Sequence, residues 1–358
     1  VEALFNLALI DGVRGDTKEQ KKKLEEVIEK DPDSVEARAA MAEVMLSERK
    51  YKRAGALFSE VLEEEPENSQ VLSGYAKVLL RQDKPEKALE LLNRAVEADP
   101  QNMFVYIDRG SAKLALEDLR GAEEDLTKAI ALNPAYYWNY VDRGRIRFHM
   151  GENKAAVEDF TRAIELNPDL FYPYVYRAGL LDDLGKDEQA LADYEEVVER
   201  KHDYFFAYEP MGKLYFMARE WKEAHRYFHK AYEFQKKQYH YLLLAALSLK
   251  KTGDEKAVHE YIEEVIGNIP RDNLYYHVAR TFSEKGYDRR ALNLIEKSAD
   301  KHLKAQTLFF LASYYLEEDK TTLAQTYLFE ALDGLYSTDV EKELAEWELN
   351  KMTGENIE

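Results

Sequence analysis

Apolar residues recur along the chain at spacings of three, four and seven, which is the period of helices that bury one face. These helical patterns come in pairs, and prolines at 32, 66, 100, 134 and 168 separate the pairs at a constant spacing of 34 residues. Self-similarity at such a period is the sequence signature of stacked helical hairpins. One hairpin buries its apolar face only against a neighbour, so the pattern predicts an all-α solenoid.

Residue size at fixed repeat positions predicts how the two helices of a hairpin meet. Position 8 is Ala or Gly in all ten repeats, and position 24 is a large apolar residue in all ten. Small residues allow the helices to approach closely, and the large residue fills the space between them. Proline at position 32 ends the second helix. A turn between the helices is predicted around position 15, where Gly15, Gly151, Gly185 and Gly253 stand.

This pattern closely resembles the tetratricopeptide repeat family over residues 1 to about 338. The resemblance implies a right-handed superhelix in which the first helix of each repeat lines the concave side. Residues 339–358 are predicted to form a C-terminal capping helix and a tail. Other residues replace the proline in four of the later repeats, which predicts a less regular second half. The predicted repeats begin near 1, 35, 69, 103, 137, 171, 205, 239, 272 and 305.

Repeat position 7 is apolar in the other repeats but is arginine in three consecutive ones, and only these three carry aspartate at position 23. A lone buried guanidinium would be destabilising, so the paired exchange predicts an ion pair between the two helices of each hairpin. A ligand-binding role for the arginines is the alternative. The predicted pairs are Arg109 with Asp125, Arg143 with Asp159, and Arg177 with Asp193.

Aromatic residues cluster directly after the prolines in the middle of the chain. Those at position 4, which are Tyr140, Tyr174 and Tyr208, are predicted to be core residues. By the family resemblance, positions 2, 5, 6, 9, 12 and 13 line the concave side, and they combine rings with charges. Such a groove suits an extended peptide or a short helix. The predicted partner-binding residues are Phe104, Asp108, Trp138, Asp142, Arg145, Phe148, Tyr172, Tyr176, Phe206, Lys213 and Phe216.

Two other interpretations of these rings stay open, namely burial between repeats and a homo-oligomer contact. One binding mode of the family is not supported. The clamp for a C-terminal carboxylate uses Lys at position 5 and Asn at position 9, and neither occurs here. Pro210 lies inside the first helix of the seventh repeat and is predicted to delay or kink it.

The composition of the chain excludes several classes of partner and of chemistry. The net charge of −19 argues against nucleic acid or an anionic membrane as the main partner, because both need a basic surface. The absence of cysteine excludes disulfides, thiol catalysis and cysteine-ligated metal. His225 and His229 have a metal-ligand spacing but no evident third ligand, so we interpret them as solvated. No motif supplies a nucleophile with a base, and we expect neither enzyme activity nor a cofactor.

We therefore expect a non-catalytic scaffold or adaptor that binds a peptide segment or a partner protein in its concave groove. The alternatives are a ligand-binding or substrate-presenting subunit of a bacterial envelope complex, and a homo-oligomeric structural protein. The missing cysteines and the start at Val1 favour a periplasmic or cell-envelope location, with a signal peptide or lipid anchor upstream. The form of the repeat resembles bacterial members of the family.

Overall fold

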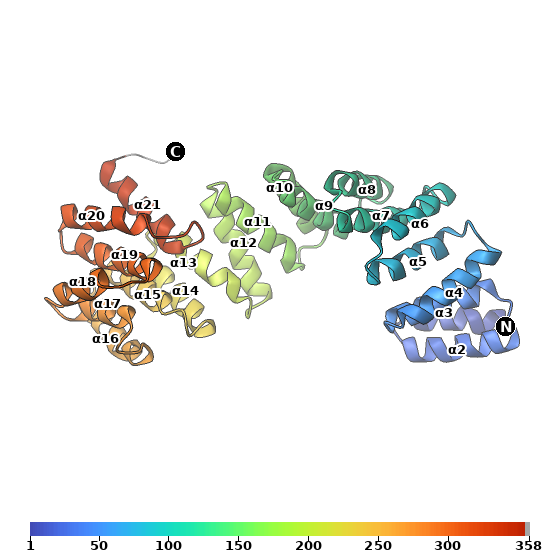
Figure 1. The fold of residues 1–358 in the computed structure, drawn as a ribbon, viewed down its shortest axis with the longest axis horizontal. Helices are drawn as coiled ribbons and strands as arrows, with labels where there is room; N and C mark the ends of the chain where they lie inside the picture. Colours follow the sequence, from blue (N-terminus) through green and yellow to red (C-terminus); the bar gives the residue numbers. More distant parts are fainter. Residues whose placement is uncertain (355–358) are drawn as a thin grey trace. The chain divides into compact units, whose positions relative to one another are not determined.

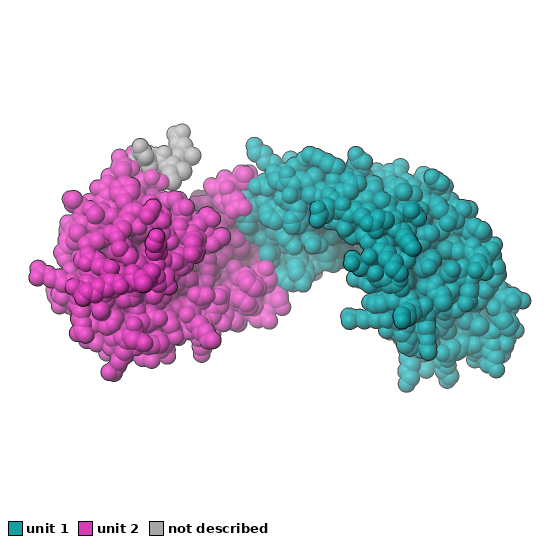
Figure 2. All heavy atoms as spheres, in the orientation of Figure 1, with its two compact units in different colours: residues 1–180 teal, residues 181–358 magenta. Residues whose placement is uncertain are grey.

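The computed structural model describes residues 1–354, and this part of the chain is built from helices without strands (Figure 1). It divides into two compact units, Val1–Leu180 (unit 1) and Leu181–Glu358 (unit 2) (Figure 2). The boundary lies inside helix α11 (Phe171–Asp183), so the sixth hairpin contributes to both units. Residues 355–358 of the predicted tail lie outside the described residues.

Unit 1 holds five regular hairpins. Their first helices have 12 or 13 residues and their second helices have 14. Each helix packs against its neighbours in chain order. The bounds are α1 Glu2–Val13, α2 Thr17–Lys30, α3 Val35–Ser47, α4 Tyr51–Glu64, α5 Ser69–Arg81, α6 Pro85–Ala98, α7 Met103–Ala115, α8 Leu119–Leu132, α9 Tyr137–His149 and α10 Asn153–Leu166.

Unit 2 is less regular, as the replaced prolines predict. Its helices range from 9 residues in α18 to 17 in α19. The bounds are α12 Asp187–Arg200, α13 Tyr208–Met217, α14 Trp221–Phe234, α15 His240–Lys250, α16 Glu255–Val265, α17 Leu274–Ser283, α18 Asp288–Glu296, α19 Lys301–Glu317, α20 Thr321–Leu332 and α21 Val340–Thr353, with 3-10 turns η1 Phe205–Ala207 and η2 Ile266–Asn268.

Pro210 delays the start of a helix, as predicted. The 3-10 turn η1 stands where the first helix of the seventh repeat was expected to begin, and α13 begins only at Tyr208. Pro210 therefore lies in the first turn of α13, where a missing N–H removes no intrahelical hydrogen bond.

The turn at position 15 confirms ten repeats within residues 1–354. The backbone is left-handed at this position in every hairpin, although only five of the ten residues are glycine. A non-glycine residue is disfavoured there by about 1–2 kcal/mol, so the packing of the two helices must impose the conformation. The glycines are Gly15, Gly151, Gly185, Gly253 and Gly286, and the others are Arg49, Asp83, Glu117, Arg219 and Asp319.

The predicted core positions are confirmed. The large residue at position 24 is buried in every hairpin, from Leu24 to Leu328. The position-4 tyrosines Tyr140, Tyr174 and Tyr208 are 8%, 6% and 4% exposed. Their rings follow the prolines for a structural reason, which Tyr140 illustrates. Its hydroxyl donates a hydrogen bond to the carbonyl oxygen of Pro134, over 3.3 Å, and so fixes the link between two hairpins.

Glycines at position 8 are not equivalent, and this gives a first prediction. We expect Gly110→Ala to stabilise unit 1 by about 0.5–1 kcal/mol, because alanine favours the helix. A Cβ there would meet its nearest neighbour at an ordinary 3.5 Å. We expect Gly212→Ala to destabilise unit 2 by about 1–3 kcal/mol through overpacking, since its Cβ would lie 2.7 Å from the Phe228 ring. Urea unfolding measures both changes.

The second repeat shows why Phe228 cannot move aside. There Phe58 accommodates Ala42 at position 8, because its ring rests against Gly74 of the next hairpin. The residue equivalent to Gly74 beside Phe228 is the fully buried Leu244. Stabilisation by Gly212→Ala would contradict this account of the packing.

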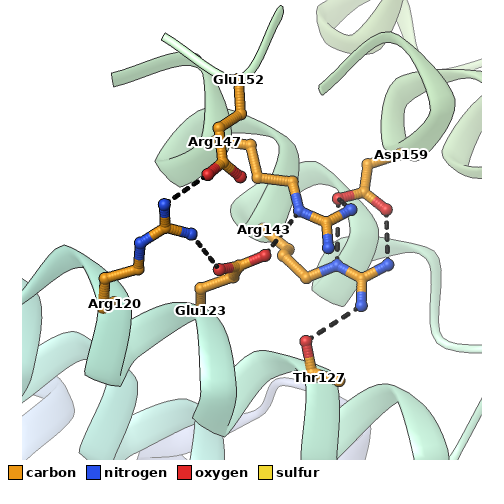
Figure 3. A network of polar contacts seen from close by, with 7 residues as sticks. All are labelled: Arg120, Glu123, Thr127, Arg143, Arg147, Glu152 and Asp159. Carbon is orange, nitrogen blue, oxygen red and sulfur yellow. Dashed lines mark hydrogen bonds and ion pairs between the residues drawn. The ribbon is translucent and has the colours of Figure 1, made fainter. Parts of the chain in front are cut away.

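Two of the three predicted ion pairs are confirmed. The Nε and Nη2 atoms of Arg109 lie 2.9 and 2.6 Å from the carboxylate oxygens of Asp125. The same atoms of Arg143 lie 3.0 and 2.6 Å from Asp159 (Figure 3). The third pair, Arg177 with Asp193, would span the two units and stays a prediction.

Each of these arginines also donates a hydrogen bond to the second helix of the preceding hairpin. The interactions therefore join neighbouring hairpins as well as the helices within one, and these contacts favour the structural interpretation over ligand binding. The acceptors are Asn93 for Arg109 at 3.2 Å, Thr127 for Arg143 at 3.1 Å and Thr161 for Arg177 at 2.9 Å.

Candidate functional site

We call the concave side, which the family resemblance assigns to the first helices of the hairpins, the inner face. In unit 1 it carries a small hollow of about 240 Å³ between α7 and α9. Ile107, Leu114 and Ile146 give it apolar walls, and Asp142 and Arg145 also line it. Four of these residues occupy the repeat positions 5, 6, 9 and 12 that the family resemblance assigns to the concave side. Leu114 is 39% exposed, so the hollow offers free apolar surface.

Two opposite charges accompany this apolar surface. Arg145 Nη1 lies 3.6 Å from Asp142 Oδ1, and the guanidinium lies 6.0 Å from the centre of the Tyr176 ring. Burial raises the pKa of Asp142, and the charge of Arg145 opposes that shift. Both side chains are about half exposed, so the pair contributes little to stability and is accessible to a partner.

A larger hollow of about 910 Å³ adjoins the first on the inner face of unit 1. Ser111 on α7 lines both hollows, which places them side by side. The predicted site residue Asp108 lies here, 3.0 Å from Lys77 Nζ, and accepts a hydrogen bond from Ser73. The larger hollow combines apolar with basic side chains, including Leu46, Leu80, Arg49, Lys77 and Arg81.

The structure divides the predicted rings of unit 1 into two groups. Phe104, Phe148 and Tyr172 are 54%, 40% and 49% exposed and therefore available to a partner. Trp138 and Tyr176 are partly buried against the core around Phe160, and Tyr176 stacks on that ring with centroids 5.2 Å apart. Burial between repeats, one of the alternatives above, therefore holds for these two.

In unit 2 the prediction of an open groove is wrong for two residues. Phe206 is 65% exposed, but Lys213 is only 7% exposed and Phe216 is fully buried. The physical reason is that helix α21 covers them. The Trp347 ring packs edge-on against Phe216 with centroids 5.8 Å apart, and Glu343 lies 2.7 Å from Lys213 Nζ.

Helix α21 packs against α13, α19 and α20. It buries one face, formed by Val340, Glu341, Leu344, Ala345, Glu348 and Leu349. Its contacts in unit 2 fall on Lys213, Phe216, His240 and Lys251, which are concave positions 9, 12, 2 and 13 by the family resemblance. The chain's own last described helix therefore occupies the inner face of unit 2.

Two carboxylates of α21 are buried, with Glu341 at 0% and Glu348 at 4% exposed. Buried charges of this kind require partners. Glu341 Oε1 lies 3.1 Å from His240 Nδ1, and Glu348 Oε1 lies 2.6 Å from Lys251 Nζ. Burial lowers the pKa of Lys251, but Glu348 and Glu317 raise it, and the pKa is raised overall. Lys251 therefore stays charged across the physiological range.

The pairing of His240 predicts a pH dependence for unit 2. Burial lowers the pKa of His240, but Glu341, with Glu209 and Asp339 further away, raises it above 6.5 overall. The resulting stabilisation is complete below 6.5 and is lost as the pH rises through the pKa of the folded state. We expect a lower urea midpoint at about pH 8.5 than at about pH 6, and His240→Gln should reduce this difference.

The prediction that His225 and His229 are solvated is wrong. Both are half-buried, and each imidazole makes a T-shaped contact with the Tyr261 ring. His225 Nδ1 lies 3.0 Å from the Ala245 carbonyl oxygen, and His229 Nδ1 lies 3.0 Å from the Tyr261 hydroxyl. Within residues 1–354, no three His, Asp or Glu side chains are arranged to hold a metal ion. No helix of that part is long and apolar enough to span a membrane.

The docking of α21 was not predicted, although one feature of the sequence indicates it. Every residue of α15 from Tyr241 to Ser248 is buried, and this stretch reads YLLLAALS. A helix that is apolar on all sides must be covered on all sides, including its concave side. The buried carboxylates of α21 gave no signal, because acidic residues are abundant in this chain.

Comparison with known proteins supports this architecture. Tetratricopeptide repeat models match residues 45–105, 105–136 and 139–170. No curated protein matches the chain. The solved structure of PilF from Pseudomonas aeruginosa is 22% identical, covers 56% of this chain and 92% of its own, and has a TM-score of 0.51. This likeness supports the fold.

Two further solved structures are similar over shorter parts of the chain. MamA from Desulfovibrio magneticus RS-1 is 25% identical over 47% of this chain and 94% of its own, with a TM-score of 0.41. YrrB, described as having an unusual peptide-binding site, is 18% identical over 51% and 95%, with a TM-score of 0.44. Repeats of this family generally serve as non-catalytic protein-interaction modules. The family matches over residues 45–136 and 139–170, and the same hairpin repeated from α1 to α20, support a tetratricopeptide repeat protein.

Proposed function

We propose that unit 1 binds a segment of a partner protein along its inner face. The observation that carries this proposal is the pair of adjoining hollows that share Ser111. They combine free apolar surface with accessible charges, which is the composition of a peptide-binding groove. An apolar side chain of the partner would enter the hollow beside Leu114.

The charges of the larger hollow indicate the character of the segment. Arg49, Lys77 and Arg81 line it together with a single carboxylate, that of Asp108. In a chain with a net charge of −19, a local excess of cations selects acidic groups. The hollows extend across α3, α5, α7 and α9, and packed helices are spaced about 8–10 Å apart. The proposal is therefore an extended, acidic segment with one apolar anchor.

This proposal predicts the effect of a charge placed in the small hollow. Peptides selected by the full chain from a displayed random library should carry an apolar residue near acidic ones. Leu114→Glu should weaken their binding at least about tenfold, because the anchor would meet a desolvated carboxylate. Leu114 is partly exposed, so the urea midpoint should change little. Fluorescence titration with synthetic peptides measures the affinity.

Val13→Glu is the matched control, since Val13 is a 91% exposed apolar residue outside both hollows. It should leave the affinity unchanged. Equal affinities for Leu114→Glu and the unaltered chain would refute binding in the small hollow. If Leu114→Glu changed the sedimentation coefficient of the chain instead, the inner face would be a contact between copies of the protein.

A further inference from the structure

The inner face of unit 2 is built to hold a helix. The helix that it holds, α21, is joined to α20 by a loop in which Tyr336, Ser337 and Thr338 are exposed. Within the described part of the chain, side-chain packing and ion pairs hold α21 in addition to this loop. Helix α21 is therefore bound in the way that a separate peptide ligand would be, except that the loop connects it covalently to α20.

The contacts specify the chemistry of the bound helix. His240 is the first residue of α15 and Lys251 directly follows its last, and they pair with Glu341 and Glu348 of α21. The two carboxylates are seven residues apart, or about two helical turns, so they lie on one face. These two contacts also set the direction of the bound helix, which runs parallel to α15.

Apolar residues complete the recognition. Leu344 lies between the two carboxylates and is fully buried, and Leu349 follows them at 6% exposure. The Trp347 ring packs edge-to-face with Phe216, and Lys351 Nζ lies 3.9 Å from the centre of the Trp347 ring. The bound helix is thus amphipathic, with an acidic and apolar buried face.

We infer that the inner face of unit 2 is a binding site for an acidic amphipathic helix, and that α21 is its resident ligand, which an external helix of the same pattern displaces. The site is distinct from the hollows of unit 1 and takes a helix where they take an extended segment. Its required pattern is two carboxylates seven residues apart with a leucine between them and an aromatic residue beside the second.

A hollow at the edge of α21 gives displacement a starting point. It has a volume of about 970 Å³ and lies within unit 2, where Trp347, Asn350 and Lys351 form one side and Leu191, Leu214 and Met217 contribute to the other. The C-terminal half of α21 therefore has open space beside it. Tethering acts as a roughly millimolar local concentration of α21, so weak external helices are excluded.

The experiment uses the full chain with a protease site inserted between Ser337 and Thr338. After cleavage, α21 stays present but is no longer tethered. The probe is a fluorescently labelled synthetic peptide of residues 339–354, and anisotropy reports its binding. We expect the cleaved chain to bind the probe. The uncleaved chain should need at least about a hundredfold more probe, because the tether competes.

Variant peptides distinguish specific docking from non-specific binding. The Glu341→Gln, Glu348→Gln peptide should bind at least about tenfold more weakly, since His240 and Lys251 lose the two carboxylates that α21 supplies. The Glu346→Gln peptide is the control, because Glu346 is exposed on α21. Failure of the cleaved chain to bind the probe would overturn the inference. So would equal binding of all three peptides, or loss of the helical circular dichroism signal of unit 2 when α21 exchanges.

Discussion

Replacing Asp159 with asparagine is expected to lower the free energy of unfolding of unit 1 by about 3–5 kcal/mol, because it breaks a buried ion pair from one side. Asp159 is 3% exposed and accepts hydrogen bonds from two arginines. Arg143 donates through Nε and Nη2, and Arg147 donates through Nη1 at 2.9 Å (Figure 3). Asparagine would leave Arg143 without a counter-charge and Arg147 with Glu123 as its remaining partner. Urea unfolding followed by circular dichroism measures the change.

Two further variants serve as comparisons for Asp159→Asn. Glu165→Gln removes an exposed partner of Arg162 on the same helix and should change stability by less than about 0.5 kcal/mol. The double variant Arg143→Met, Asp159→Leu installs the apolar pair that the second repeat carries at Met41 and Leu57. It should be more stable than Asp159→Asn, because an apolar pair replaces a buried ion pair at little loss. If Asp159→Asn were as mild as Glu165→Gln, the ion pair would have no structural role.

Replacing Lys251 with methionine is expected to lower the free energy of unfolding of unit 2 by about 3–5 kcal/mol. Lys251 Nζ lies 2.7 Å from Glu317 and 2.6 Å from Glu348, and its side chain is only 8% exposed. Methionine keeps the length of the side chain but leaves Glu317 without its cation and Glu348 with Lys351 alone, 3.4 Å away. The loss should shrink at low pH, where protonation removes their charge.

The control for Lys251 is Lys256→Met in the same unit. Lys256 is 84% exposed and pairs with Glu260 over 3.4 Å, so its replacement should be nearly neutral. Hydrogen exchange adds a second measurement. If α21 is held by Lys251, its amides should exchange first in the Lys251→Met chain. A loss no larger than that of Lys256→Met would show that the buried pair does not hold α21.

Much of the fold could be predicted from the sequence because the contacts within and between hairpins repeat. Position 8 contacts position 24 in one hairpin after another. The preference for a small residue at the first and a large apolar residue at the second can therefore be recognised above chance variation. The ion pairs of Arg109 with Asp125 and of Arg143 with Asp159 could be predicted for the same reason. Both partners change together against a constant background in the other repeats.

The candidate site could be predicted only in part, because the family pattern tells which positions face inward but not what covers them. Phe104 and Trp138 share repeat position 2, yet Phe104 is exposed and Trp138 packs on the core. The difference depends on neighbouring side chains in space. Six of the ten turn residues at position 15 were likewise not named, five of them because only glycine reveals a left-handed backbone in a sequence.

By itself, then, the sequence determined the helical hairpin, its register, its buried positions and the buried arginine–aspartate pairs. These features depend on short, repeated distances along the chain. Only the tertiary structure decided that unit 1 keeps an open inner face while unit 2 fills its own. That difference rests on contacts such as Lys213 with Glu343, which are 130 residues apart. Because such a contact occurs once and is not repeated along the chain, the periodicity of the sequence does not predict it.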